Sequence, residues 1–173
     1  MKPLVLVGLP GAGKTTLGIA LARRVGLLFF DSDEEIERRT GQRIAEIFET
    51  SGEDGFRALE REVACELGQD TDCIVALGGG GFQDPHTRAL LLAQCHVVWL
   101  DPLHEVILER LRATTGRPLF AGRDTDQVLR ELKAARQVAF AEAHARICEH
   151  RLGPAIAAIE KMLMDREGAP CVL

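Results

Sequence analysis

The sequence predicts a three-layer α/β fold built on a parallel sheet. Short apolar runs without polar alternation are typical of strands buried on both faces, and five of them span residues 4–7, 27–30, 73–77, 97–100 and 146–148. Helical patterns lie between these runs, at 15–24, 33–39, 43–50, 55–67, 86–93, 103–112, 125–143 and 154–164. Strands that alternate with helices form a covered parallel sheet, whose ligands bind beyond the carboxyl ends of the strands.

The chain has the size and composition of one globular domain spanning residues 1–173. Hydrophobic residues make up 46% of it and charged residues 27%, which suits a chain that buries a good core without disulfides. No apolar run reaches the length of a membrane span, and the glycine-rich loop starts too near Met1 to leave room for a signal peptide. The five cysteines form no C-x-x-C pair, which predicts reduced thiols in a cytoplasmic protein.

The balance of charge restricts the possible partners. A net charge of −5 with no basic stripe argues against nucleic acid. Any anionic substrate must therefore be held by a local cluster of arginines. We expect a monomer that acts on small molecules, with neither a nucleic acid nor a membrane as partner.

A glycine-rich loop follows the first strand, Gly8-Leu9-Pro10-Gly11-Ala12-Gly13-Lys14-Thr15, and fits G-x-x-x-x-G-K-[ST] in full. The apolar-faced helix after it completes the strand–loop–helix context, which disfavours a turn that only connects the two elements. Backbone N–H groups in such a loop surround phosphate oxygens, here from Gly11 to Thr16. Lys14 would reach the β- and γ-phosphates and the Thr15 hydroxyl would hold Mg²⁺. The sequence thus predicts a site for ATP or a related nucleotide.

Two carboxylates follow the second strand in the run Asp31-Ser32-Asp33. Residues two apart in an extended backbone face the same way, so both point beyond the strand end. One would approach Mg²⁺ while the other takes the proton of an acceptor hydroxyl. The alternative is that Asp33 caps the helix that follows, a role that is compatible with catalysis. Asp101 ends an apolar run as a Walker B aspartate does, but the following Pro102 favours a helix cap.

Other segments bear on the phosphoryl acceptor. The chain has no asparagine, so the N-K-x-D guanine reader of GTPases is absent. Four glycines at 78–81 close the third strand and would let a small ring lie against bare backbone. Residues 113–124 carry two Gly, one Pro and two Arg, the composition of a lid. Taken alone, Arg57 and Arg136 are each more often expected to be solvated charges on a helix face than functional residues.

Together these residues resemble the shikimate kinase family. The resemblance runs from the first strand to about Phe140, through the glycine-rich loop, Asp31-Ser32-Asp33, 44–48, 55–60, 77–80, Gly116-Arg117-Pro118-Leu119 and Arg136. It implies the nucleoside-monophosphate-kinase type of fold, with a five-stranded parallel sheet ordered 2-3-1-4-5. It also implies transfer of phosphate from ATP to the 3-hydroxyl of shikimate, with a substrate-binding helical segment at about 33–60.

The resemblance also implies a role for individual residues. Lys14 and Arg117 would hold the phosphates, and Arg110 would lie near adenine. Thr15 and Asp31 would place Mg²⁺, while Asp33 would hold the shikimate hydroxyls and serve as the candidate base. The remaining substrate contacts would come from Arg57, Gly79, Gly80 and Arg136, the two arginines clamping the carboxylate.

Two alternatives remain open from the sequence. One is another small-metabolite kinase of the same architecture, such as a gluconate kinase, whose acceptor lacks a ring carboxylate. The other is a nucleotide-dependent binding protein with a silent acceptor pocket, although Asp33 and Arg117 would then have no evident use.

Overall fold

The computed structural model of the protein describes residues 1–113, 120 and 122–167. Its five strands form one sheet in the order β2-β3-β1-β4-β5, and every neighbouring pair is parallel. The strands are β1 (Leu4–Val7), β2 (Leu28–Asp31), β3 (Cys73–Ala76), β4 (His96–Leu100) and β5 (Ala145–Ile147). The predicted fold class and strand order are therefore confirmed.

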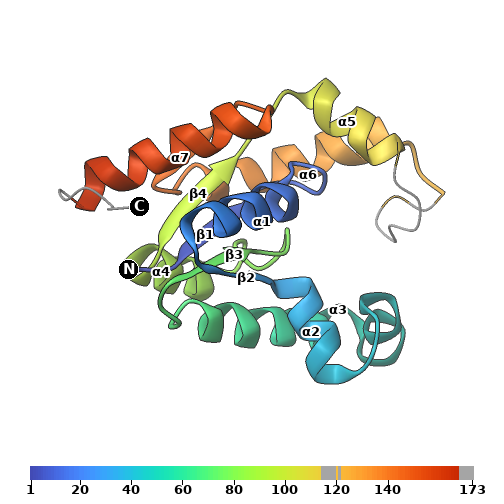
Figure 1. The fold of residues 1–173 in the computed structure, drawn as a ribbon. Coiled ribbons are helices and arrows are strands. Elements are labelled where there is room, and N and C mark those ends of the chain that lie inside the picture. The colour runs from blue at the N-terminus through green and yellow to red at the C-terminus, as the bar shows by residue number, and fades with distance from the viewer. Residues whose placement is uncertain (114–119, 121, 168–173) are drawn as a thin grey trace.

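Helices cover both faces of this sheet (Figure 1). They are α1 (Lys14–Val25), α2 (Ser32–Thr40), α3 (Ile44–Leu67), α4 (Pro85–Gln94), α5 (His104–Arg112), α6 (Thr125–Phe140) and α7 (Leu152–Glu167). Side chains of α1 and α7 pack with alternate residues of the strands in one apolar cluster. Residues of α3, α4 and α6 form the cluster on the opposite face. Within the described residues, no helix is long and apolar enough to cross a membrane.

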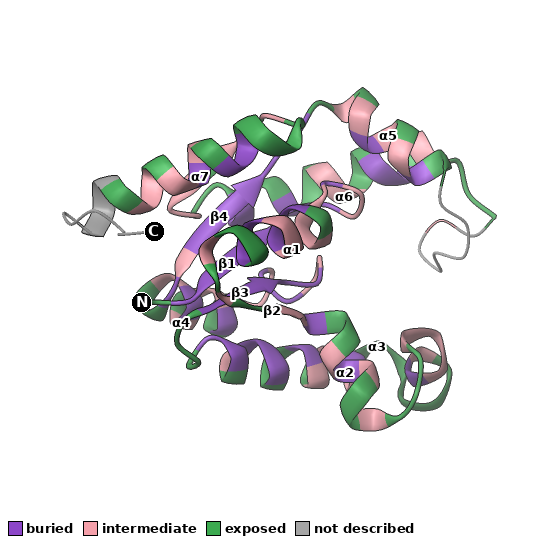
Figure 2. Cartoon of the chain, in the orientation of Figure 1, coloured by how far each residue is buried: buried purple, intermediate pink, exposed green. Residues whose placement is uncertain are grey.

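Burial of the strands follows their place in the sheet. The three central strands β3, β1 and β4 are almost wholly buried (Figure 2). The edge strands β2 and β5 are partly exposed. An apolar run alone does not distinguish an edge strand from a central one, because its neighbours are set by the topology.

The helices expected at 43–50 and 55–67 correspond to the two parts of α3, which are separated by a kink at Gly52, whose φ is 68°. Helix capping departs from the sequence-based expectations at two points. The cap of α2 is Asp31 and not Asp33, since Asp31 Oδ1 accepts a hydrogen bond from the Asp33 N–H at 3.1 Å. The expected cap at Asp101 is also wrong, because α5 begins at His104 after Leu103.

Parallel register brings the carboxyl ends of the strands to one edge. Leu6 pairs with Ala76 on one side and Val98 on the other, while Asp31 is level with Ala76. The loops that leave β1, β2 and β3 consequently start from neighbouring positions. This edge holds the residues that the sequence singled out.

Candidate active site

The glycine-rich loop leads from β1 into α1. Gly8 has φ +146°, and a Cβ at this position would lie 2.5 Å from the carbonyl oxygen of Leu100. Gly13 caps α1 with φ 99° and has no side chain to satisfy the first turn. This helix end, with its positive dipole, is therefore shaped for an anionic ligand.

Lys14 and Arg110 both lie against this loop. Lys14 Nζ donates hydrogen bonds to the carbonyl oxygens of Gly8 at 3.0 Å and Leu9 at 3.3 Å. Arg110 from α5 donates to the loop carbonyls of residues 11 and 12 and also to the carbonyl of His150 at 3.1 Å. Arg110 thus joins the glycine-rich loop to the segment after β5.

The side chains expected at the metal lie together. Thr15 Oγ1 donates to Asp31 Oδ2 at 2.8 Å. Mg²⁺ is held by few protein oxygens and completes its shell with phosphate and water, and one hydroxyl with one carboxylate fits that preference. The described residues contain no cluster of three His, Cys, Asp or Glu side chains, and a magnesium–nucleotide site needs none.

Asp33 carries the most perturbed acid at this edge. Its pKa is raised from 3.8 to about 6, first because surrounding protein desolvates the carboxylate and then because Asp31 and Glu60 are negatively charged. Lys14 is close enough to oppose this shift. Asp33 as a whole residue is exposed, but its carboxylate lies against the backbone of Gly78, which accounts for the desolvation. A group with this pKa is suited to take a proton near neutral pH.

The first three of the four glycines after Leu77 make room for charged side chains. A Cβ on Gly78 would overlap Asp33 Oδ1, and one on Gly79 would lie 2.5 Å from Arg136 Nη1. A Cβ on Gly80 would overlap Arg57 Nη1. The glycine run therefore lets the candidate base and both arginines approach the same stretch of backbone.

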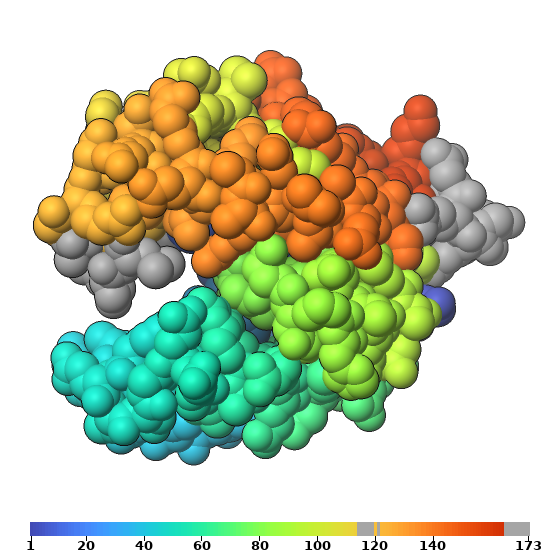
Figure 3. All heavy atoms as spheres, turned by 180° about the vertical axis from the view of Figure 1, so that it is seen from behind, coloured from blue at the N-terminus to red at the C-terminus, as the bar shows by residue number. Residues whose placement is uncertain are grey.

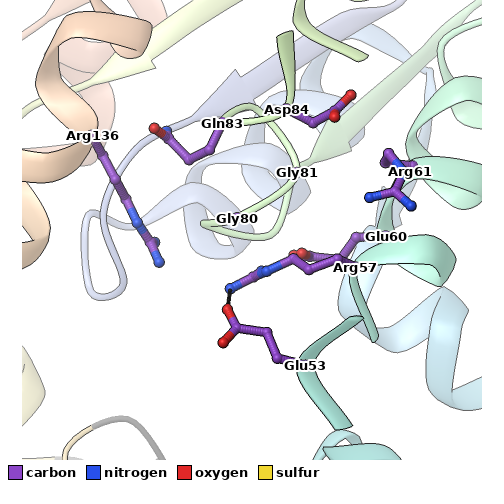
Figure 4. Close-up of a pocket in the computed structure, with 9 residues that line it drawn as sticks. All are labelled: Glu53, Arg57, Glu60, Arg61, Gly80, Gly81, Gln83, Asp84 and Arg136. Carbon is purple, nitrogen blue, oxygen red and sulfur yellow. Dashed lines mark hydrogen bonds and ion pairs between the residues drawn. The ribbon is translucent and has the colours of Figure 1, made fainter. Parts of the chain in front are cut away.

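Arg57 and Arg136 line one cavity of about 360 Å³, which opens beside Gly80. They come from α3 and α6 and point toward one another across it (Figure 4). Arg57 is held by ion pairs with Glu60 and, at 3.1 Å, with Glu53. The expectation that these arginines are ordinary solvated charges is wrong, because each lies against the glycine run.

Arg136 is held differently from Arg57. It is 8% exposed, and no hydrogen bond or ion pair reaches its guanidinium from the described residues. Burial and then the like charge of Arg57 lower its pKa below the ordinary value, although a guanidinium remains charged. A buried cation in this state favours an anionic ligand.

The cavity opens into a cleft between the α3 region and α6 (Figure 3). From the expected substrate segment at 33–60, Glu53, Arg57 and Glu60 line the cavity, and the role of this segment in binding substrate stays a prediction. Arg117 and most of the expected lid at 113–124 lie outside the described residues, so their expected roles stay predictions.

Sequence reasoning missed five further residues that line the cavity: Glu53, Glu60, Arg61, Gln83 and Asp84. Glu60 is 4% exposed and pairs with Arg57 one turn earlier. Its i,i+3 spacing from Arg57 was the available signal. Gln83 gave no comparable signal, since only the turn after the glycine run brings it to the cavity.

Asp101 takes neither of the roles considered for it. Its carboxylate accepts hydrogen bonds from Lys133 of α6 and Arg146 of β5. It is therefore committed to a structural ion-pair cluster on the far side of β4 from Asp31.

The fold and site define a class of protein: a P-loop kinase with a cavity lined by two facing arginines. The family model for shikimate kinase matches residues 10–165. A shikimate kinase of Caulobacter vibrioides is 41% identical over 162 residues, which cover 94% of this chain and 80% of that relative. The chain belongs to the shikimate kinase family, whose members are ATP-dependent kinases.

Solved structures agree with this assignment. Shikimate kinase from Acinetobacter baumannii in complex with shikimate has a TM-score of 0.86 and 38% identity, covering 97% of this chain and 94% of its own. A gluconokinase from Sinorhizobium meliloti has a TM-score of 0.63 and 16% identity, covering 96% and 95%. The second likeness extends to the fold alone.

Proposed function

We propose that this protein transfers the γ-phosphate of ATP to the 3-hydroxyl of shikimate and yields ADP and shikimate 3-phosphate. The observation that carries the choice of acceptor is the buried Arg136 guanidinium facing Arg57 across the cavity. Two guanidinium forks suit a planar carboxylate, which each can bind through paired hydrogen bonds. An acceptor without a ring carboxylate would leave Arg136 desolvated and uncompensated.

The phosphate donor would occupy the loop at the start of α1. We assign the backbone of residues 11–16 and the Lys14 ammonium to the phosphates, with Arg117 joining them. Arg110 would border the adenine. Lys14 and Arg110 already lie against the loop, and such preorganised charge is the main protein contribution to phosphoryl transfer.

Thr15 and Asp31 are the residues that would hold Mg²⁺. When bound, the ion neutralises charge that develops on the phosphate oxygens. Asp31 Oδ1 also accepts a hydrogen bond from the backbone N–H of Asp33. Asp31 would therefore help to position both Mg²⁺ and the candidate base.

Asp33 would accept the proton of the attacking hydroxyl. Its carboxylate lies against Gly78, two residues before the glycine that lines the cavity. A ring whose carboxylate reaches Arg57 and Arg136 would rest on Gly79 and Gly80 and turn its hydroxyls toward Asp33. Binding would thus place the acceptor oxygen near both the base and the phosphate loop.

The test compares acceptors in one assay. ADP release from MgATP is measured with shikimate, gluconate, AMP or no acceptor, and product is identified by mass spectrometry. We expect turnover with shikimate alone, and we expect its loss in Lys14→Ala. Faster turnover with gluconate would favour the alternative kinase, and ADP release that no acceptor accelerates would contradict both.

We also propose that the protein acts as a monomer in the cytoplasm on small molecules. The described cysteines at 65, 73, 95 and 148 are free thiols, in keeping with a reducing compartment. The net charge of −5 disfavours nucleic acid. Light scattering with and without both substrates measures the mass, and a stable dimer would contradict the monomer.

A further inference from the structure

Asp101 is a buried carboxylate that the proposed reaction does not use. Its side chain is 3% exposed and directly follows β4. Lys133 Nζ from α6 lies 3.2 Å from Oδ1, and the Arg146 guanidinium from β5 pairs with Oδ2. A carboxylate removed from water needs such partners, so Asp101 joins the end of β4 to two other elements.

The segment of α6 that Asp101 holds is the one that carries Arg136. Lys133 precedes Arg136 by three residues, which makes the two side chains neighbours on the helix surface. In the described part of the chain, Arg136 has no hydrogen bond or ion pair of its own. The position of its guanidinium therefore depends on where α6 lies.

A chain of ring contacts reaches the same segment from its other end. The Arg146 guanidinium lies 4.5 Å from the centre of the Trp99 ring, and the Trp99 and Phe140 ring centres are 5.9 Å apart. Phe140 follows Arg136 by one turn and stacks on Phe82 at 6.3 Å. Since Phe82 directly follows the glycine run, these contacts connect the Asp101 cluster to α6 and to the glycine run that lines the cavity.

We propose that Asp101 is a positioning residue for acceptor binding, which acts through Lys133 and Arg146 to set where α6 presents Arg136. The inference rests on the proposed function, because the acceptor's carboxylate is what Arg136 is assigned to bind. A bidentate contact is largely lost when a guanidinium is displaced by about 1 Å. The proposal assigns Asp101 no contact with either substrate. Its loss should therefore weaken the binding of shikimate, through Arg136, and leave the binding of the nucleotide unchanged.

The experiment is Asp101→Asn, which keeps the shape of the side chain and removes its charge. Steady-state kinetics should show the KM for shikimate raised about tenfold, as expected for residues coupled in one network. The KM for ATP and kcat at saturating shikimate should stay within about twofold, since only acceptor binding is changed. In an Arg136→Ala background the same substitution should have no further effect on the KM for shikimate.

Further variants separate positioning from stability. Lys133→Met should reproduce the rise in KM if Asp101→Asn fails to fold, and Lys133→Arg should restore most of the affinity. The control is Glu160→Gln, which breaks the ion pair at 2.6 Å between Glu160 of α7 and Arg24 of α1. It should lower stability and leave both KM values unchanged.

Three results would overturn the proposal. These are an unchanged KM for shikimate, an equal rise for both substrates, or an undiminished effect of Asp101→Asn in the Arg136→Ala background. If the wild-type protein itself does not phosphorylate shikimate, the proposed function fails together with this inference. If it does and Lys133→Met is inert, the inference alone fails.

Discussion

Asp33 has a chemistry that is set by its neighbours. Desolvation and the charges of Asp31 and Glu60 raise its pKa from 3.8 to about 6, while the same residue in an unfolded chain titrates at its ordinary value. The folded protein consequently binds more protons than the unfolded one between these two values. Ionising Asp33 costs stability as the pH rises through this window, and the ionised form is the one that accepts a proton.

The first prediction is that kcat/KM for shikimate falls as the pH drops below about 6, with a limiting slope of one proton. This pKa belongs to the free enzyme, which is what kcat/KM reports. Asp33→Asn should lose most activity and the acidic limb with it. It should also be more stable than wild type above pH 6 and equally stable near pH 3, by chemical denaturation at each pH.

A pH–rate profile for kcat/KM that stays level down to pH 5 would contradict the assignment of Asp33 as base. So would an Asp33→Asn protein whose residual activity keeps the same acidic limb. Glu35, whose pKa its arginine neighbours on α2 lower to about 2, is a control carboxylate. Glu35→Gln should leave the profile unchanged.

The second prediction concerns the two arginines in the cavity wall. Arg136→Ala should weaken the binding of shikimate by about 2–5 kcal/mol, because it removes one partner of a desolvated charge pair. Arg57→Ala should act in the same direction, and Arg136→Lys should rescue poorly because an ammonium offers no planar fork. Calorimetric titration with shikimate and with ATP measures each ligand separately. Equal weakening of both ligands would refute the assignment.

At the scale of the element, glycine is required for different reasons in the loop after β1 and in the run after β3. Gly8 must be glycine because of its positive φ and the nearby Leu100 carbonyl, which are constraints of the backbone. Gly80 is crowded only by the ends of the Arg57 and Glu60 side chains. The two sites should therefore respond differently to one added methyl group.

The third prediction is that Gly8→Ala destabilises the fold by about 1–3 kcal/mol, which is the usual cost of a strained backbone. The same substitution should weaken the binding of ATP. Gly80→Ala should keep more of its stability and instead raise the KM for shikimate, because Arg57 must turn aside. Gly153→Ala is the reference, since nothing lies within 4 Å of its added Cβ. Thermal unfolding and the two KM values measure these effects, and a loss of ATP affinity in Gly80→Ala would contradict the distinction.

At the scale of the whole molecule, the cleft is formed by elements far apart in the chain. One wall comes from α3 and the other from α6 (Figure 3), and Gly80 and Gly81 line the cavity between them. A ligand that bridges the walls stabilises the folded state by mass action, by about 2.7 kcal/mol at a hundred times its Kd.

The fourth prediction follows from this linkage. Shikimate and MgADP at that excess should each raise the Tm, by about 5–11 °C for a domain of this size. Arg136→Ala should lose most of the shift caused by shikimate and keep the shift caused by MgADP. Differential scanning fluorimetry measures both, and a shikimate shift that survives in Arg136→Ala would place the acceptor elsewhere.

The sequence by itself determined what local patterns encode. The glycine-rich loop, the alternation of apolar runs with helices and the Asp31–Asp33 spacing are features of a few consecutive residues, and the structure has each of them. Strand order came from resemblance to a family and is confirmed. The helix cap predicted at Asp101 from the following Pro is wrong. The Asp101 carboxylate instead forms ion pairs with side chains from other elements of the fold, which the local sequence does not reveal.

The tertiary structure decided which distant side chains meet. Arg57 and Arg136 stand 79 positions apart, and only the packing of α3 and α6 on one face of the sheet brings them to Gly79 and Gly80. The same packing desolvates Asp33 and buries Asp101 between α6 and β5. Burial and charge coupling depend on distances in space, and helix or strand periodicity carries no information about distances between elements far apart in the chain.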